Sequence, residues 1–336
     1  MVDLGRIRHN LAILDDVQRR SGAKILMALK AFSMWSTFPL IRQTLQGVCA
    51  SSPWEAQLGR EKFDREVHSF AAAFKEDDVE ELLQISDHLV FNSFQQLERF
   101  RPLWQKEQGR VSIGLRVNPE HSEGAVELYD PCAPKSRLGI PRRDFEGKSV
   151  EGVEGLHFHT LCEQLFEPLE RTAKVFEEKF GEFLPQMKWL NLGGGHHISR
   201  DGYDVDGLVE LIIYFREKYD LEVYIEPGEA IVIGSGLLVS EVLDVVTNEI
   251  DTAILDVSAT CHMPGLLPAK SRSPIASVGH PAWPVISSVT GRSKSRCSRE
   301  TGSRFSTWPI TPWSRQRLLT ASSFRIFAHT SRSRRN

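Results

Sequence analysis

Residues 189–225 read WLNLGGGHHISRDGYDVDGLVELIIYFREKYDLEVYI and contain one complete strand, helix and strand pattern. The short apolar runs at 189–192 and 222–225 are typical of buried strands, and 205–219 has the length and pattern of a helix. A helix between two such strands is the usual connection of neighbouring parallel strands. The segment therefore predicts a parallel α/β fold.

The same alternation extends outward from this segment, from Ile7 to about Ile233. Further strands are expected at 24–29, 47–50, 87–91, 112–117 and 155–159, and helices at 6–20, 37–47, 93–100 and 168–180. Ser52 is expected to cap a helix that begins at Pro53. Repeated units of this kind predict a (β/α)8 barrel. After Gly234, strand-like patterns at 237–246 and 252–257 follow without a helix, so a mostly β domain is expected there.

The composition is that of an ordinary globular enzyme, with 41% hydrophobic and 25% charged residues in a chain of 336. No apolar run approaches the roughly 20 residues of a membrane span, and residues 1–8 lack a signal-peptide pattern. We therefore expect a cytoplasmic protein without membrane association.

Metal and disulfide chemistry are not expected. The five cysteines are scattered without CxxC spacing, which argues against a disulfide framework and a zinc site. His196 and His197 have no third ligand at metal spacing. We therefore expect no metal in the site.

The net charge of −3 hides an asymmetry along the chain. Residues 265–336 hold 13 of the 41 basic residues, 15 serines and one of the 44 acidic residues, Glu300. The net charge is therefore near −15 in 1–264 and near +12 in 265–336. A basic tail of this kind can bind nucleic acid or an acidic partner.

Two ionisable residues each stand where an expected strand ends. Lys30 follows the strand at 24–29, and Glu226 follows the strand at 222–225. Barrel enzymes place catalytic groups at such positions. A lysine there can bond to an aldehyde once its amine is deprotonated, and a carboxylate can keep a pyridine nitrogen protonated. Taken alone, each residue is more often a surface side chain than a catalytic one.

A triple glycine and two alternating histidines add to this pattern. Gly193, Gly194 and Gly195 follow a strand, and glycines let backbone N–H groups cradle a phosphate. The run can also be a plain turn, since it matches neither a Walker loop nor GxGxxG. His157 and His159 are expected on one face of their strand, where one could stack on a cofactor ring or both could be core or rim residues.

In this order, the segments resemble the fold-type III pyridoxal-phosphate decarboxylases, the group that includes ornithine and diaminopimelate decarboxylases. Within that group they are similar to the carboxynorspermidine (carboxyspermidine) decarboxylase family, over about residues 2–264. The resemblance is carried by ALKAFSMW at 28–35, SRLG at 136–139, HFHTLCE at 157–163, LGGGHH at 192–197 and LDVSATCHMP at 255–264.

The resemblance implies an alanine-racemase-like barrel followed by a β domain, working as a homodimer on a polyamine substrate. It implies pyridoxal 5'-phosphate as the cofactor, bonded to Lys30, with His159 stacked on its ring. Gly193 to Gly195 would hold the phosphate, Glu226 would pair with the pyridine nitrogen and Glu229 would contact the cationic substrate. The implied reaction is a carboxy-lyase step of polyamine biosynthesis, from carboxynorspermidine or carboxyspermidine to norspermidine or spermidine.

After Pro264 the chain departs from the family pattern. The family has two further blocks, one with a cysteine for the partner subunit's site and one with a tyrosine for the phosphate. Neither block occurs in the given sequence. However, when residues 279–286 and 306–315 are translated back into permitted codons and read from the third base of each codon, both blocks can be obtained. We therefore expect a barrel at 1–233, the start of a β domain at 234–264, and an out-of-frame, poorly ordered tail at 265–336 that impairs activity.

Three other functions stay open at this stage. The chain could decarboxylate another basic amino acid, or it could be a non-catalytic barrel that binds pyridoxal phosphate. A nucleic-acid-binding tail is the third, although a frameshift accounts for the basic composition without it. Substrate profiling, a bound cofactor without carbon dioxide release, and salt-dependent DNA binding would distinguish them.

Overall fold

The structure is a computed structural model that describes residues 1–121, 123–124, 130–248, 250–257, 276–278 and 324–329. The chain divides into two compact units, Arg8–Ile231 and Met1–Ile7 with Val232–Asn336. In the described part of the chain, no helix is long and apolar enough to cross a membrane.

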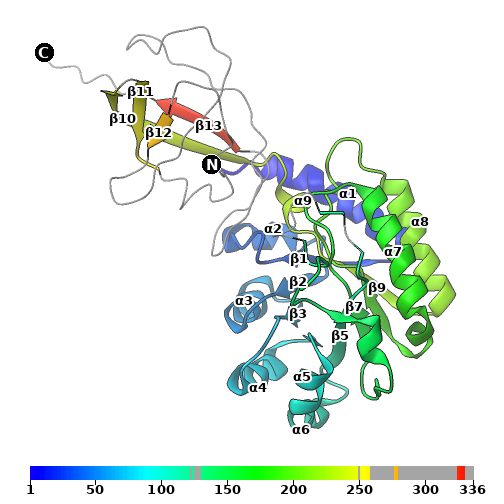
Figure 1. Cartoon of the computed structure of the whole chain (residues 1–336). Helices are drawn as coiled ribbons and strands as arrows, with labels where there is room; N and C mark the ends of the chain where they lie inside the picture. Colours follow the sequence, from blue (N-terminus) through cyan, green and yellow to red (C-terminus); the bar gives the residue numbers. More distant parts are fainter. Residues whose placement is uncertain (122, 125–129, 249, 258–275, 279–323, 330–336) are drawn as a thin grey trace, which may run out of the picture. The chain divides into compact units, whose positions relative to one another are not determined.

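Eight parallel strands form a closed barrel in the first unit (Figure 1). They run in the order β4-β3-β2-β1-β9-β8-β7-β5, and pairing of β4 with β5 closes the ring. The strands are β1 (Lys24–Ala28), β2 (Gly47–Ala50), β3 (Glu66–Phe70), β4 (His88–Phe91), β5 (Ser112–Asn118), β7 (Gly155–His157), β8 (Trp189–Asn191) and β9 (Glu222–Ile225). The two-residue strand β6 (Ile140–Pro141) adds to β5. The predicted (β/α)8 barrel is confirmed.

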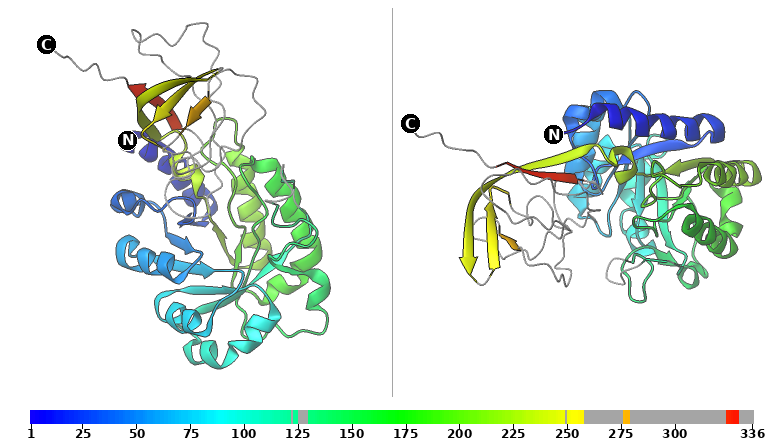
Figure 2. Two further views of the ribbon diagram at one scale, coloured as in Figure 1. Left: turned by 60° about the vertical axis from the view of Figure 1, so that its left-hand side comes forward. Right: turned by 90° about the horizontal axis from the view of Figure 1, so that it is seen from above.

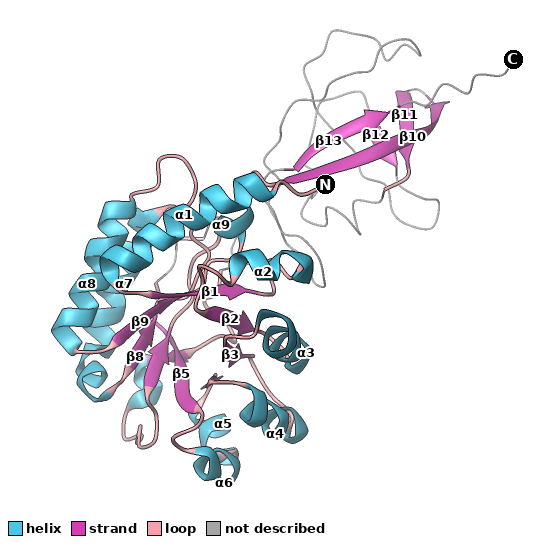
Figure 3. Ribbon diagram, turned by 180° about the vertical axis from the view of Figure 1, so that it is seen from behind, coloured by secondary structure: helices cyan, strands magenta, loops and turns pink. Residues whose placement is uncertain are grey.

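Helices surround the strands of this unit, as Figure 3 shows by colour. They are α1 (Leu4–Ser21), α2 (Phe38–Ile41), α3 (Pro53–Leu58), α4 (Glu76–Ile85), α5 (Phe94–Arg99), α6 (Arg101–Trp104), α7 (Phe166–Phe180), α8 (Val205–Tyr219) and α9 (Glu229–Val232). Ser52 caps α3 as predicted, accepting a hydrogen bond from the Glu55 N–H at 3.3 Å. Apolar helix faces such as Leu169, Phe176 and Phe180 of α7 are buried.

The structure corrects two predicted elements and adds two that the sequence did not predict. The helix expected at 37–47 is a short 3-10 turn followed by α2, which ends at Ile41, because hydrogen-bonded turns then lead directly into β2. β7 ends at His157, so His159 lies beyond the strand. The strand β3 and the helix α4 were absent from the prediction, because Glu66 and His68 interrupt the apolar run that marks a buried strand.

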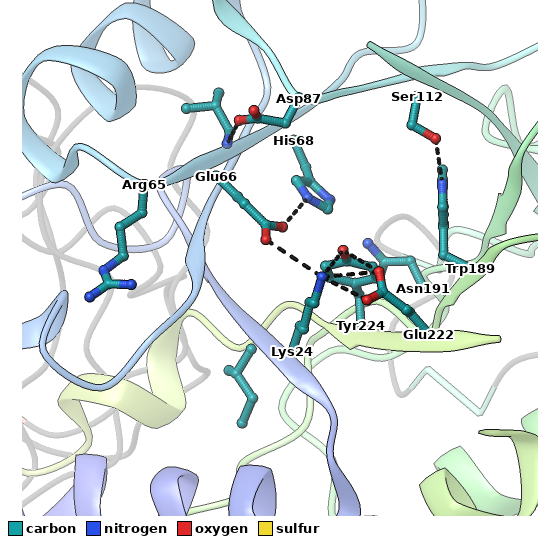
Figure 4. Close-up of polar contacts among 12 residues, drawn as sticks. Lys24, Arg65, Glu66, His68, Asp87, Ser112, Trp189, Asn191, Glu222 and Tyr224 are labelled. Atoms are coloured by element: carbon teal, nitrogen blue, oxygen red, sulfur yellow. Dashed lines mark hydrogen bonds and ion pairs between the residues drawn. The ribbon is translucent and has the colours of Figure 1, made fainter. Parts of the chain in front are cut away.

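Polar side chains fill the amino end of the barrel (Figure 4). The Lys24 ammonium lies 2.8 Å from a Glu222 carboxylate oxygen and 3.7 Å from one of Glu66. The His68 ring stacks on His88 at 3.8 Å between centroids. Nearby, the Trp189 indole N–H donates to Ser112 Oγ at 2.8 Å, and Ser112 donates in turn to Glu154. The charges at this end are thus paired within the protein.

The second unit contains an antiparallel strand pair that is drawn in yellow in Figure 2. β10 (Gly236–Asn248) and β11 (Ile250–Leu255) pair with an irregularity between Val242 and Asp244. β12 (Ala276–Val278) pairs with β11 and β13 (Phe324–His329) with β10, both in parallel. Residues 258–275, 279–323 and 330–336 lie outside the described residues. The predicted tail and the domain boundaries at 233 and 264 therefore stay predictions.

Candidate active site

Lys30 lies in the turn directly after β1, at the carboxyl end of the barrel. The turn is held from two sides, because the Ala28 N–H donates to Pro227 O and the Leu29 N–H donates to Cys49 O, both at 3.0 Å. The Lys30 side chain is exposed, and within the described ranges its ammonium has no hydrogen-bond or ion-pair partner. The backbone of the Lys30 turn is thus fixed, and its side chain has no pairing partner among the described residues.

The turn after β9 packs against the Lys30 turn and carries both predicted carboxylates. A Cβ at Gly228 would lie 2.3 Å from the Ala31 Cβ, so glycine permits this close approach. Glu226 is 9% exposed, and Asn191 donates to its Oε1 at 2.7 Å. The structure therefore brings Glu226 and Lys30 to the same end of the barrel.

The glycine run forms a tight turn that no larger residue fits. Gly193 and Gly195 have φ values of +69° and +87°, and a Cβ at Gly194 would lie 1.9 Å from the Glu226 carbonyl oxygen. The Gly194 N–H donates to His159 Nδ1 at 3.0 Å, which leaves the imidazole proton on Nε2. Burial, and secondly the Lys30 ammonium, holds the pKa of His159 well below its usual value. His159 is therefore a neutral ring fixed beside the glycine turn.

His157 lies deeper in the barrel and is the less satisfied of the two histidines. Its ring packs edge-on against Phe70 at 5.6 Å, and its Nε2 is 3.8 Å from a Glu226 oxygen. Both ring nitrogens are buried without a hydrogen-bond partner among the described residues. Burial first, then the Arg116 and Lys30 charges, hold the pKa of His157 well below its usual value. A neutral ring with unsatisfied nitrogens at this depth indicates a site that a ligand completes.

Sequence reasoning missed Arg116 on β5. Arg116 is 4% exposed, and its guanidinium donates to the His159 carbonyl at 3.0 Å and lies 4.5 Å from the centre of the Phe70 ring. Burial lowers the pKa of Arg116 to about 10, which still leaves it charged at neutral pH. The available signal was a charged residue within the apolar run SIGLRVN.

Cys49 on β2 was also missed. Burial first, and secondly the Glu226 charge, raise the pKa of its thiol well above the usual value. Cys49 is therefore a neutral group beside Glu226, and no spacing in the sequence could have placed it there.

Glu229 at the start of α9 is paired with His197. The His197 Nε2 and Glu229 Oε2 atoms are 3.0 Å apart, and both side chains are almost fully buried. The other carboxylate oxygen, Oε1, is buried without a hydrogen-bond partner in the described part of the chain. The predicted residues Lys30, His159, Gly193, Gly194, Gly195, Glu226 and Glu229 thus all lie at the carboxyl ends of the strands.

A lysine, a carboxylate and a glycine turn around one end of a closed parallel barrel define the class of fold-type III decarboxylase barrels. The solved carboxynorspermidine decarboxylase of Campylobacter jejuni, in complex with norspermidine, superposes with a TM-score of 0.75 at 37% identity, covering 85% of this chain and 82% of that one. No family model matches the chain.

Two curated relatives match most of the chain. The carboxynorspermidine/carboxyspermidine decarboxylase of Campylobacter jejuni is 46% identical over 259 residues, which are 77% of this chain and 67% of the relative. The carboxyaminopropylagmatine decarboxylase of a Synechocystis species is 40% identical over 263 residues, 78% of this chain and 67% of the relative. The chain belongs to the carboxynorspermidine/carboxyspermidine decarboxylase family, and the predicted enzyme class, a carboxy-lyase, is confirmed.

Proposed function

We propose that the carboxyl end of the barrel binds pyridoxal 5'-phosphate and removes the carboxyl group of carboxynorspermidine or carboxyspermidine. The observation that carries the proposal is the convergence of Lys30, Glu226 and the glycine turn on one end of the barrel. The residues fit this cofactor by their chemistry. An unpaired amine suits its aldehyde and a carboxylate suits its ring nitrogen. The glycine turn would let a phosphate approach the backbone, although the Gly193 and Gly194 N–H groups already donate to Asn191 and His159.

The bound cofactor would supply an electron sink for the electrons that the departing carbon dioxide leaves behind. Lys30 would hold the cofactor, and Glu226, oriented by Asn191, would keep a proton on the ring nitrogen. His159 would stack on the ring as a neutral group, because its Nδ1 is held by the Gly194 N–H. Arg116 would fix the position of His159 through the backbone carbonyl. Glu229 would attract an ammonium group of the substrate.

The test is to load the full chain with pyridoxal phosphate and to supply carboxynorspermidine, carboxyspermidine and carboxyaminopropylagmatine separately. The proposal predicts carbon dioxide release with norspermidine or spermidine as the product, identified by mass spectrometry. Release from lysine, arginine or diaminopimelate alone would favour a decarboxylase of another basic amino acid. A bound cofactor without release from any of these acids would favour a non-catalytic binding protein.

We also propose a homodimer in the cytoplasm and a frameshift after Pro264. The frameshift is supported by the length of the matched segment, since the Campylobacter jejuni relative matches 259 residues of this chain of 336. Sequencing the gene across codons 255–336 tests it directly. The expected result is that the missing cysteine and tyrosine blocks lie in another frame, and the repaired chain should then be more active and dimeric by light scattering.

A further inference from the structure

Two loops at the carboxyl end of the barrel lie side by side and bring Glu163 next to His197. The Gln164 N–H donates to Gly195 O at 3.2 Å, and the His197 N–H donates to Gln164 O at 2.9 Å. A Cβ at Gly195 would lie 2.0 Å from Leu161 O, so the loops touch here as well. Because its neighbours on both sides are held, the position of Glu163 is set by the backbone.

Glu163 itself is unusual in conformation and environment. Its φ of +59° lies in the left-handed region, which residues other than glycine rarely adopt and which often marks functional sites. Burial first, and secondly the Glu229 charge, raise the pKa of its carboxyl to about 7, while His197 and Arg200 act in the opposite direction. Within the described ranges no residue hydrogen-bonds this carboxylate. The Glu229 charge thus acts on the Glu163 carboxyl and disfavours its ionisation.

A ligand is indicated by the second carboxylate. The Glu229 side chain is 10% exposed, and His197 occupies Oε2 but leaves the buried Oε1 without a hydrogen-bond donor in the described part of the chain. A buried acceptor without a partner costs about 1–3 kcal/mol. A donor that also carries positive charge would satisfy Oε1 and relieve the repulsion between Glu163 and Glu229.

We propose that Glu163 and Glu229 together hold one ammonium group of a polyamine ligand, and that Glu163 determines the preference for polyamines. This inference rests on the proposed function, because it assumes a cationic polyamine at this end of the barrel. An ammonium offers several N–H donors, so it can bond to Glu229 Oε1 and to the Glu163 carboxylate at once. An uncharged ligand would leave the negative charges of both carboxylates uncompensated.

The test is the affinity of the cofactor-loaded full chain for norspermidine, measured by calorimetry at pH 8. The Glu163→Gln variant removes the charge but keeps the size of the side chain, and it should bind norspermidine about tenfold more weakly. The matched control is Glu170→Gln, on the exposed surface of α7, which should bind as the wild type does.

The pH dependence provides a second readout that a merely structural role would not change. With a pKa of about 7, Glu163 is mostly protonated at pH 6 and mostly charged at pH 8, so wild-type affinity should rise about tenfold over this interval. Glu229, His197 and Arg200 surround the group in both proteins. The Glu163→Gln variant should therefore lose this part of the pH dependence.

Unchanged affinity and unchanged pH dependence in Glu163→Gln would overturn the inference. This holds even if Glu229→Gln loses binding, because Glu229 would then bind the ammonium group alone. That result would leave the proposed function intact. The proposed function would fail separately if the wild type released no carbon dioxide from any polyamine acid. Failure of the wild type to bind norspermidine at all would overturn the inference whatever the decarboxylation assay shows.

Discussion

The two ends of the barrel carry similar polar residues in opposite states. At the amino end Lys24 is paired with Glu222 and Glu66, and the Trp189 indole bonds to Ser112, although His88 Nδ1 has no hydrogen-bond partner among the described residues (Figure 4). At the carboxyl end, within the described residues, Lys30 has no pairing partner and Glu229 Oε1 has no donor. Lys24, which is paired within the protein, and Lys30, which has no pairing partner in the described residues, are thus only six positions apart in the sequence. The difference assigns stability to one end and binding to the other.

The largest expected effect is at the carboxyl end. Lys30→Ala should lower the decarboxylation rate by about a thousandfold or more, because the amine that holds the cofactor is gone. The melting temperature without cofactor should change little, since Lys30 has no partner to lose in the described structure. The measurements are carbon dioxide release and thermal melting. A strongly destabilised variant would mean that Lys30, at the carboxyl end, also contributes to the stability of the fold.

The glycine turn provides a matched pair of variants. Gly195 and Gly202 have φ values of +87° and +83°, but only at Gly195 would a Cβ meet a neighbour, Leu161 O at 2.0 Å. Gly202→Ala should therefore cost about 1–2 kcal/mol from the backbone alone, and Gly195→Ala a further 1–3 kcal/mol or so from the clash. Chemical denaturation measures both.

Loss of affinity for pyridoxal phosphate should accompany Gly195→Ala and not Gly202→Ala. Equal stability of the two variants would contradict the close contact that places the glycine turn.

Acid should lower the stability of the fold, and two of the buried histidines responsible lie at the amino end. Burial first, and secondly the Lys24 charge, lower the pKa of His68 to about 3, and burial also lowers that of His88. Both rings stay neutral in the folded state while the unfolded chain takes up protons near pH 6.5, so the free energy of unfolding falls as the pH drops below that value. Each histidine should contribute about 2 kcal/mol of loss between pH 7 and pH 5.

Denaturant titrations at several pH values test this, with His68→Phe expected to reduce the slope and His9→Gln, at an exposed position of α1, expected to leave it unchanged. A slope in His68→Phe equal to that of the wild type would show that His68 does not contribute to the acid sensitivity.

The smallest effect is expected for Lys24→Met. The ion pairs of Lys24 are partly exposed, with 31% of its side chain accessible, so their loss should cost about 1 kcal/mol. The decarboxylation rate should stay at the wild-type level, because Lys24 lies at the amino end of the barrel and the candidate active site lies at the carboxyl end. Thermal melting tests the expected loss of stability, and the rate of product formation tests the unchanged activity. A reduced rate with normal stability would contradict the assignment of binding to the carboxyl end alone.

The residues that the sequence predicts best are those fixed by local chemistry. The sequence alone shows a lysine after an apolar run, three adjacent glycines and a glutamate before Pro227. The barrel then brings these residues together. Arg116, Glu163 and the free oxygen of Glu229 could not be predicted, because their importance depends on neighbours from other strands. The strand β3 was not predicted for a related reason, because Glu66 and His68 belong to the polar amino end.

The central claim is that the free lysine at the carboxyl end, and not the paired one at the amino end, holds the cofactor. Borohydride reduction of the chain with pyridoxal phosphate, followed by peptide mass mapping, tests it most directly. We expect a pyridoxyl-phosphate mass on Lys30, with Lys24 unmodified. Modification of Lys24, or no modification of Lys30, would contradict it.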